Sequence, residues 1–413
     1  ILLHIRPLFI SDVNIPILFS LPAPHSSLSS HGSDMFPVLS LLLSYFLSSA
    51  TAQKLVFAQT LWRHGARIPT GTYPSDPYQE SFWGAPWGEL TTNGMQQHFI
   101  QGQRLRQRYM TETGLLNPKY SRYETTIRSA DTPRCIQSAL ANFAAFYSNS
   151  PTYPLDTNGW PSAWTPIPVH SMPKNEDREL EPGVSCPRAT QLANSRENQP
   201  AFQNFLASNW QLFATINTNA GRIYEANMQT LFELIGSLSV ERDDFNLTMP
   251  SWVTDQFYYS LKSAVEYGED YTAGAAGFGL PEDTDLLKLR GGFMLKAFVD
   301  NIKDVIGNLT TTKYYVFSGH DTIERQLLYC LGVKNSVIGM GIPYYASMIA
   351  NELWMKDGQY FVKFLFSANA DSELKDFTSL IPPCKSDVCP LNAFLQYVQK
   401  YLPADASKEC AIH

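Results

Sequence analysis

The sequence predicts an α/β fold that carries a second, smaller and mostly helical domain. Three runs typical of strands, at residues 55–58, 123–128 and 313–317, are each followed by a loop with charged side chains and then by a helical pattern. Parallel α/β sheets gather such loops at the carboxyl ends of their strands. From residue 189 to about residue 287 strand patterns vanish and helical periodicity dominates, which indicates a helical insertion.

We expect the first 52 residues to be absent from the folded protein. Residues 35–52 begin with Met35, continue with a short apolar core and end in Ala50-Thr51-Ala52, which predicts a secretory signal peptide. A buried helix is the alternative interpretation. Residues 1–34 would then be upstream sequence. No later stretch has the ~18 consecutive apolar residues of a membrane helix, so we expect a secreted protein without a membrane anchor.

Charge and cysteine content narrow the class of protein. The formal net charge is -7, and no Lys/Arg run suggests a nucleic-acid partner. An even number of cysteines in a secreted chain favours disulfides, although spacing alone leaves many pairings open. The tripeptides at Asn246 and Asn308 are glycosylation acceptors, which agrees with secretion. Either tripeptide can also be an unused sequence match.

The first strand leads into Arg63-His64-Gly65-Ala66-Arg67. A helix is expected from Thr91 or Thr92, which can cap it, through Tyr109. The second strand ends in Arg128, and Pro133 opens a helix over residues 134–147. Arg128 is therefore either a ligand for an anion or a surface arginine.

The third strand ends in His320-Asp321, before a helix over residues 323–331. The insertion contains helical patterns at residues 197–217, 223–238 and 254–267, and a helix over 286–308 is interrupted near Gly291-Gly292. Alternating residues at 346–356 and 359–366 flank Asp357-Gly358 and predict a hairpin. A last helix is expected over residues 391–401.

The loop after the first strand has the chemistry of a phosphate site. Two guanidiniums beside one imidazole suit phosphate oxygens, which accept paired hydrogen bonds. Gly65 removes a Cβ where an anion approaches the backbone. The pattern R-H-G-x-R-x-P is expected by chance only about 10⁻⁴ times in such a chain, whereas a His-Asp pair alone is a weak signal.

Three strand ends together supply the groups that hydrolysis of a phosphate monoester requires. His64 can attack phosphorus when it is neutral, and adjacent arginines disfavour its imidazolium form. Asp321 fits the general acid. The expected phosphate ligands are Arg63, Arg67, Arg128 and, when protonated, His320.

These motifs resemble the histidine acid phosphatase family, in particular its prostatic and lysosomal branch. The resemblance rests on the loop at residues 63–69, the pair His320-Asp321, and the segments at residues 90–98, 127–131, 166–170 and 246–252. It implies the same site residues and no metal or other cofactor. It also implies a three-layer sandwich with a mainly parallel sheet, of the phosphoglycerate mutase type. That sheet domain would comprise residues 53–184 and 286–413, with a helical cap at 185–285.

The resemblance also implies two disulfides, Cys384–Cys389 and Cys186–Cys410. Cys135 and Cys330 do not match the branch's remaining cysteines. Because both follow strands that end at the site, we predict a third disulfide between them, with two buried free thiols as the alternative. Trp164 resembles a tryptophan at the family's dimer contact, which implies a homodimer.

The predicted function is a secreted acid phosphatase that acts on small phosphomonoesters or phosphopeptides. A phytase of the same family is the first alternative; the prostatic-like segments and a cap without an obvious Lys/Arg cluster argue against it. Secretion disfavours a phosphoglycerate-mutase-like enzyme. A non-catalytic secreted relic is the alternative from another class, and delivery to the lysosome is the second localisation.

Overall fold

The computed structural model describes residues 53–148, 150 and 164–412. The predicted signal peptide and residues 1–34 lie outside the described residues. Over the described ranges, no helix is both long enough and apolar enough to cross a membrane.

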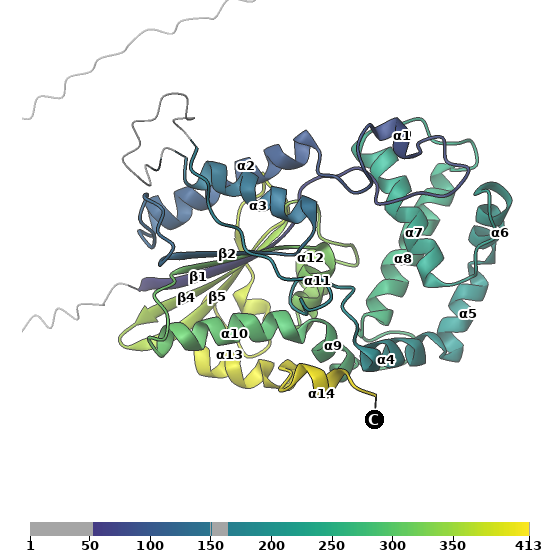
Figure 1. The fold of residues 1–413 in the computed structure, drawn as a ribbon. Helices are drawn as coiled ribbons and strands as arrows, with labels where there is room; N and C mark the ends of the chain where they lie inside the picture. Colours follow the sequence, from purple (N-terminus) through teal and green to yellow (C-terminus); the bar gives the residue numbers. More distant parts are fainter. Residues whose placement is uncertain (1–52, 149, 151–163, 413) are drawn as a thin grey trace, which may run out of the picture. The chain divides into compact units, whose positions relative to one another are not determined.

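One mixed sheet forms the centre of the described structure, and the predicted α/β class is confirmed (Figure 1). The strands run in the order β2-β3-β1-β4-β5-β6, and β7 pairs with β5. Their bounds are β1 Lys54–Arg63, β2 Thr125–Ser129, β3 Tyr314–Gly319, β4 Met348–Lys356, β5 Gln359–Ser367, β6 Lys375–Asp376 and β7 Cys389–Pro390. β3 is parallel to both β1 and β2, whereas β4 to β7 join through antiparallel pairs.

The predicted hairpin connects β4 to β5 and accounts for part of the antiparallel half. Asp357 and Gly358 both have positive φ, at 50° and 74°. Such angles suit the tight two-residue turn that matches the twist of paired strands.

Helices cover both faces of the sheet (Figure 1). α2 (Thr92–Arg106) and α3 (Pro133–Phe146) pack on one face, and α10 (Gly292–Ile306), α11 (Asp321–Cys330) and α13 (Leu391–Val398) on the other. Alternate residues of β1 point to opposite faces, so Phe57 and Leu61 join one hydrophobic cluster while Ala58 and Trp62 join another. The result is three layers, helix on sheet on helix.

The region predicted as an insertion is helical and has a hydrophobic cluster of its own. It contains α4 (Pro187–Glu197), α5 (Pro200–Ser208), α6 (Trp210–Asn219), α7 (Met228–Ser239) and α8 (Asp255–Thr272). The single helix expected over residues 197–217 is wrong. Pro200 starts α5, because proline suits the first helical turn, and Asn209 leaves the helical conformation before α6. The domain boundaries at 185 and 285 stay a prediction.

Short elements complete the chain. They are α1 (Glu80–Trp83), α9 (Thr284–Arg290), α12 (Lys334–Ile338), α14 (Ala406–Cys410), π-helical turns at Gln107–Glu112 and Val240–Asp244, and 3-10 turns at Thr378–Leu380 and Gln399–Tyr401. The interruption expected near Gly291-Gly292 separates α9 from α10. At Gly292 a Cβ would lie 2.1 Å from the Tyr401 carbonyl oxygen, so close packing requires glycine there.

Two of the three expected disulfides are present, Cys186–Cys410 and Cys384–Cys389. The predicted pair of Cys135 with Cys330 is wrong, because both are buried free thiols. The Cys135 Sγ lies 3.4 Å from the Gly319 carbonyl, just before α11, whereas Cys330 is the last residue of α11. A helix rises about 1.5 Å per residue, so about 13 Å of helix separates the two positions. A disulfide requires Cα atoms within about 7 Å.

Candidate active site

Two parallel strands bring the two site histidines to one edge of the sheet. Arg63 at the end of β1 is in register with Gly319 at the end of β3. His64 and His320 are the next residues of their strands, and their ring centroids lie 5.6 Å apart. The predicted convergence of these two loops is therefore confirmed by the strand register.

The loop after β1 lies against the start of α2. The Ala66 amide donates to Gln97 Oε1 at 2.8 Å, and the Gly65 amide donates to Ser138 Oγ at 3.1 Å. A Cβ on Gly65 would lie 2.3 Å from the Gly94 carbonyl oxygen. Glycine is thus required at position 65 by the approach of two backbones, rather than by an anion as the sequence suggested.

His64 is held as a neutral base with one nitrogen available. Its Nδ1 lies 2.9 Å from the Gly65 carbonyl oxygen. Because a carbonyl only accepts, Nδ1 carries the proton and Nε2 keeps its lone pair. Burial, followed by the charges of Arg63 and Arg134, lowers the pKa of His64 well below its ordinary value. The neutral form therefore persists at mildly acid pH.

Arg63 connects the nucleophile candidate to the acid candidate. Its Nη2 lies 2.9 Å from Asp321 Oδ2, and its guanidinium carbon lies 4.2 Å above the Tyr345 ring. Burial raises the pKa of the Asp321 carboxyl, but the charge of Arg63 and its neighbours outweighs burial and holds this pKa below its ordinary value. Asp321 is thus ionised while no anion is bound.

Three guanidiniums act on His64 and share an unusual feature. In Arg63, Arg67 and Arg134 the Nε–H is buried and finds no hydrogen-bond partner within the described ranges. A buried donor without a partner is costly. Three such donors whose guanidiniums act on one imidazole indicate an anion-binding site.

Arg128, a predicted phosphate ligand, lies elsewhere. Its register partner is Phe317, two residues before Gly319, so the side chain stops short of the sheet edge. It forms ion pairs with Asp177 and Glu179, whose carboxylates occupy its donors. Arg128 is therefore engaged by these carboxylates, and no contact of the described residues supports it as a phosphate ligand.

Arg134 is the arginine that the sequence reasoning missed. It occupies the second position of α3, and its Nη1 is 3.2 Å from the place a Cβ on Gly88 would take. Its charge lowers the pKa of both His64 and His320. A signal existed, because Asp321 was assigned from the same kind of position, in the first helical turn after a strand end.

His320 is buried in the site beside a thiol and a carboxylate. Its Nε2 is 3.7 Å from Cys135 Sγ and 3.9 Å from Glu181 Oε2. Burial and the charge of Arg134 lower the pKa of His320 to about 3. A neutral imidazole still donates one N–H, so His320 can hold a phosphate oxygen without the protonation that the sequence analysis assumed.

Comparison with known proteins agrees with this arrangement. The sequence profile of the histidine phosphatase superfamily (branch 2) matches residues 54–367. Lysosomal acid phosphatase of Rattus norvegicus is 33% identical over 362 residues, which cover 87% of this chain and 81% of that protein. Prostatic acid phosphatase of Homo sapiens is 30% identical over 375 residues, covering 90% and 92%.

The fold is also found in solved structures of low sequence identity. The Hafnia alvei phytase in complex with tartrate has a TM-score of 0.60 at 15% identity and covers 88% of this chain and 100% of that one. The Klebsiella phytase has a TM-score of 0.59 at 15% identity. With the sequence matches, the strand register and the charged loops taken together, the chain belongs to the histidine acid phosphatase family, branch 2 of the histidine phosphatase superfamily.

Proposed function

We propose that the chain is a secreted acid phosphatase that hydrolyses phosphate monoesters through a phosphohistidine at His64. The observation that supports it most strongly is the neutral His64 with three guanidiniums whose buried Nε–H groups have no partner in the described structure. Arg63, Arg67 and Arg134 would bind the non-bridging oxygens of the phosphoryl group, with His320 as a fourth ligand. Positive charge at these oxygens stabilises the transition state.

In the first step the His64 Nε2 lone pair attacks phosphorus. A P–N bond forms as the bond from phosphorus to the ester oxygen breaks, and the leaving oxygen takes a proton from Asp321. Because Asp321 is ionised in the free enzyme, we infer that the substrate enters as its monoanion and transfers its proton to Asp321. The bound phosphoryl charge also offsets Arg63 and raises the affinity of Asp321 for that proton.

In the second step a water molecule attacks the phosphohistidine. The P–N bond breaks, and Asp321, now a carboxylate, accepts a proton from the water. Inorganic phosphate takes this proton from Asp321 as it leaves, so His64 returns to its neutral form and Asp321 to its carboxylate. The hydrogen bond from Nδ1–H to the Gly65 carbonyl keeps the ring oriented through both steps.

His64→Ala tests the nucleophile. It should lower kcat for 4-nitrophenyl phosphate by at least about 1,000-fold, as removal of a nucleophile does in other hydrolases. His98→Ala is the matched control, because His98 is also a buried histidine but binds the Arg63 carbonyl at 3.1 Å. Phosphatase activity that survives in His64→Ala, with a melting temperature like that of the wild type, would exclude this mechanism and leave the non-catalytic alternative open.

Asp321→Asn tests the proton donor. Alkyl leaving groups need protonation, whereas nitrophenolate needs little. The variant should therefore lose more activity on glycerol 3-phosphate than on 4-nitrophenyl phosphate, by about tenfold or more. Equal losses on both substrates would contradict the acid role.

Rates on a substrate panel test the choice between acid phosphatase and phytase. We expect higher kcat/KM on simple monoesters than on inositol hexakisphosphate, and the reverse order would favour the phytase alternative.

For secretion, the supporting features are the predicted signal peptide, the two disulfides and the exposed acceptors Asn246 and Asn308. Trp164 is 42% exposed, which is compatible with the homodimer we propose. Mass of the secreted protein before and after glycosidase, and its elution volume, test these points.

A further inference from the structure

A cavity of about 150 Å³ adjoins the phosphate site and is not used by the mechanism above. Thr322 and Glu181 line it at the catalytic end. The Thr322 amide donates to Asp321 Oδ1 at 2.7 Å, and Glu181 lies beside His320. The cavity therefore begins one residue from the proposed acid, where the leaving group of a bound substrate would lie.

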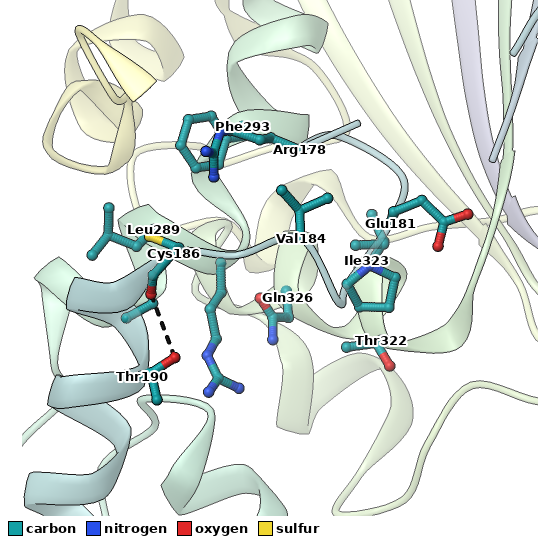
Figure 2. A pocket seen from close by; sticks show the side chains of 13 residues that line it. Arg178, Glu181, Val184, Cys186, Thr190, Leu289, Phe293, Thr322, Ile323 and Gln326 are labelled. Atoms are coloured by element: carbon teal, nitrogen blue, oxygen red, sulfur yellow. Dashed lines mark hydrogen bonds between the residues drawn. The ribbon is translucent and has the colours of Figure 1, made fainter. Parts of the chain in front are cut away.

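Side chains from the loop before α4 and from α4, α9, α10 and α11 form the walls (Figure 2). Thr322 and Gln326 of α11 lie across the cavity from Cys186 and Thr190, at the start of α4. Arg290, the last residue of α9, completes the lining on that side. The cysteine at the rim belongs to the disulfide with Cys410, so covalent bonding fixes this wall.

Two guanidiniums line this cavity. The Arg178 Nη1 donates to the Ser185 carbonyl at 2.9 Å and lies 3.4 Å from Cys410 Sγ, and no carboxylate of the described residues pairs with Arg178. Arg290 forms no ion pair or hydrogen bond with any residue of the described ranges. The acids whose charges act on Arg290 are Glu197 and Glu269. Glu269 is already paired with Arg325 at 2.6 Å. Burial and the charge of Arg325 lower the pKa of Arg290 from its ordinary value, although the charges of Glu197 and Glu269 oppose that shift.

We propose that this cavity is a second anion site, in which Arg290 and Arg178 bind a carboxylate or phosphate carried by the leaving group of the substrate. The proposal rests on the proposed phosphatase function and names its preferred substrates: phosphomonoesters with a second anionic group. Gln326 supplies a neutral donor beside that anion. Glu181, the one carboxylate of the lining, lies at the catalytic end next to His320.

The test compares substrate pairs that differ in the remote group. The short pair is 3-phosphoglycerate, which carries an additional carboxylate, and glycerol 3-phosphate, which does not. The long pair is fructose 1,6-bisphosphate, which carries an additional phosphate, and fructose 6-phosphate, which does not. For at least one pair, Arg290→Gln should lower kcat/KM for the substrate with the second anion by about tenfold, the typical worth of a charged hydrogen bond. Its partner substrate should change by less than about twofold, and Arg178→Gln should act in the same direction.

Two controls keep the interpretation clear. Arg188→Gln removes a positive charge of α4 that is paired with Asp285 at 2.8 Å and does not line the cavity, so it should leave both ratios unchanged. Arg290→Lys keeps a charge and should retain part of the preference, even if the glutamine variant folds poorly.

The outcome also separates this proposal from the proposed function. Ratios that stay the same in Arg290→Gln and Arg290→Lys for both pairs, while His64→Ala is inactive, would overturn the second anion site alone. An active His64→Ala would overturn the phosphatase mechanism instead.

Discussion

Individual side chains at the site are arranged so that positive charge surrounds a neutral base. His64 cannot gain a proton easily, because burial and three arginines oppose it. Among the described residues the same arginines find no partner for Nε, so these donors remain open to an incoming anion. Both features follow from placing guanidiniums at a strand end, in the loop after it and at a helix start, which the sheet edge brings together, and they favour electrostatic preorganisation in the proposed mechanism.

Separate replacement of Arg134 and Arg128 by glutamine tests which of the two arginines belongs to the site. Arg134→Gln should lower kcat/KM by about 100-fold or more, since it removes a proposed ligand of the phosphoryl oxygens. Arg128→Gln should leave kcat/KM within about threefold but reduce the free energy of unfolding, because Asp177 would remain buried without its partner. Steady-state kinetics and urea unfolding of both variants measure this. A large kinetic loss in Arg128→Gln alone would restore the assignment made from the sequence.

The pH dependence of kcat/KM follows from the two pKa values at the reacting atoms. Both His64 and Asp321 have pKa values below their ordinary ranges, so we expect neither group to govern the profile at mildly acid pH. The proton for the leaving group then comes from the substrate monoanion, whose second pKa is about 6. For glycerol 3-phosphate, kcat/KM should be level near pH 5 and fall about tenfold per unit above about pH 6.5. A profile that rises from pH 5 to 7 would contradict proton delivery by the substrate.

At the scale of elements, two buried acids, Glu241 of the helical region and Asp76 of the loop before α1, act on each other by charge. Glu241, in the turn after α7, has no exposed surface, and neither of its carboxyl oxygens has a partner within the described residues. Burial and the charge of Asp76 raise the pKa of Glu241 to about 9. The folded protein therefore holds a proton that the unfolded chain releases at pH values above about 4.5. Stability from this group is present at acid pH and is lost as pH rises toward 9.

Glu241→Gln should remove this pH dependence. The amide mimics the protonated acid, so the variant should be more stable than the wild type by about 1–3 kcal/mol at pH 7.5 and about equal to it at pH 4.5. Urea unfolding at both pH values measures the difference. Glu233→Gln is the control on the adjacent helix, because Glu233 lies exposed beside Arg222. A similar stabilisation at both pH values would mean that packing, and not the proton, is responsible.

At the scale of the whole molecule, the two disulfides close loops of very different length. Cys186–Cys410 spans 224 residues and ties α4 to α14, whereas Cys384–Cys389 spans only 5. In the chain-entropy account, the long loop stabilises by about 5 kcal/mol and the short loop by about 2 kcal/mol. Replacing both cysteines of the long pair by serine should therefore lower the free energy of unfolding more than replacing the short pair. Equal effects from the two double variants would argue against loop length as the cause.

The number of reactive thiols can be counted directly and tests whether Cys135 and Cys330 are free. Denatured but unreduced protein should react with two equivalents of a thiol reagent, at Cys135 and Cys330. In the native state reaction should be slow, because burial raises the pKa of Cys135 to about 12 and that of Cys330 as well. No reactive thiol after denaturation would mean that the predicted third disulfide forms after all.

By itself the sequence determined the fold class, the hairpin around Asp357-Gly358, and the loops that carry His64 and His320. These depend on local periodicity and on residues placed at strand ends, which sequence neighbours report. The tertiary structure decided three further points: that Arg134 rather than Arg128 acts on His64, that Gly65 makes room for Gly94, and that Cys330 lies a helix length from Cys135. Each of these depends on register between strands or on the length of a helix, and such distances are fixed only when segments far apart in the chain pack together.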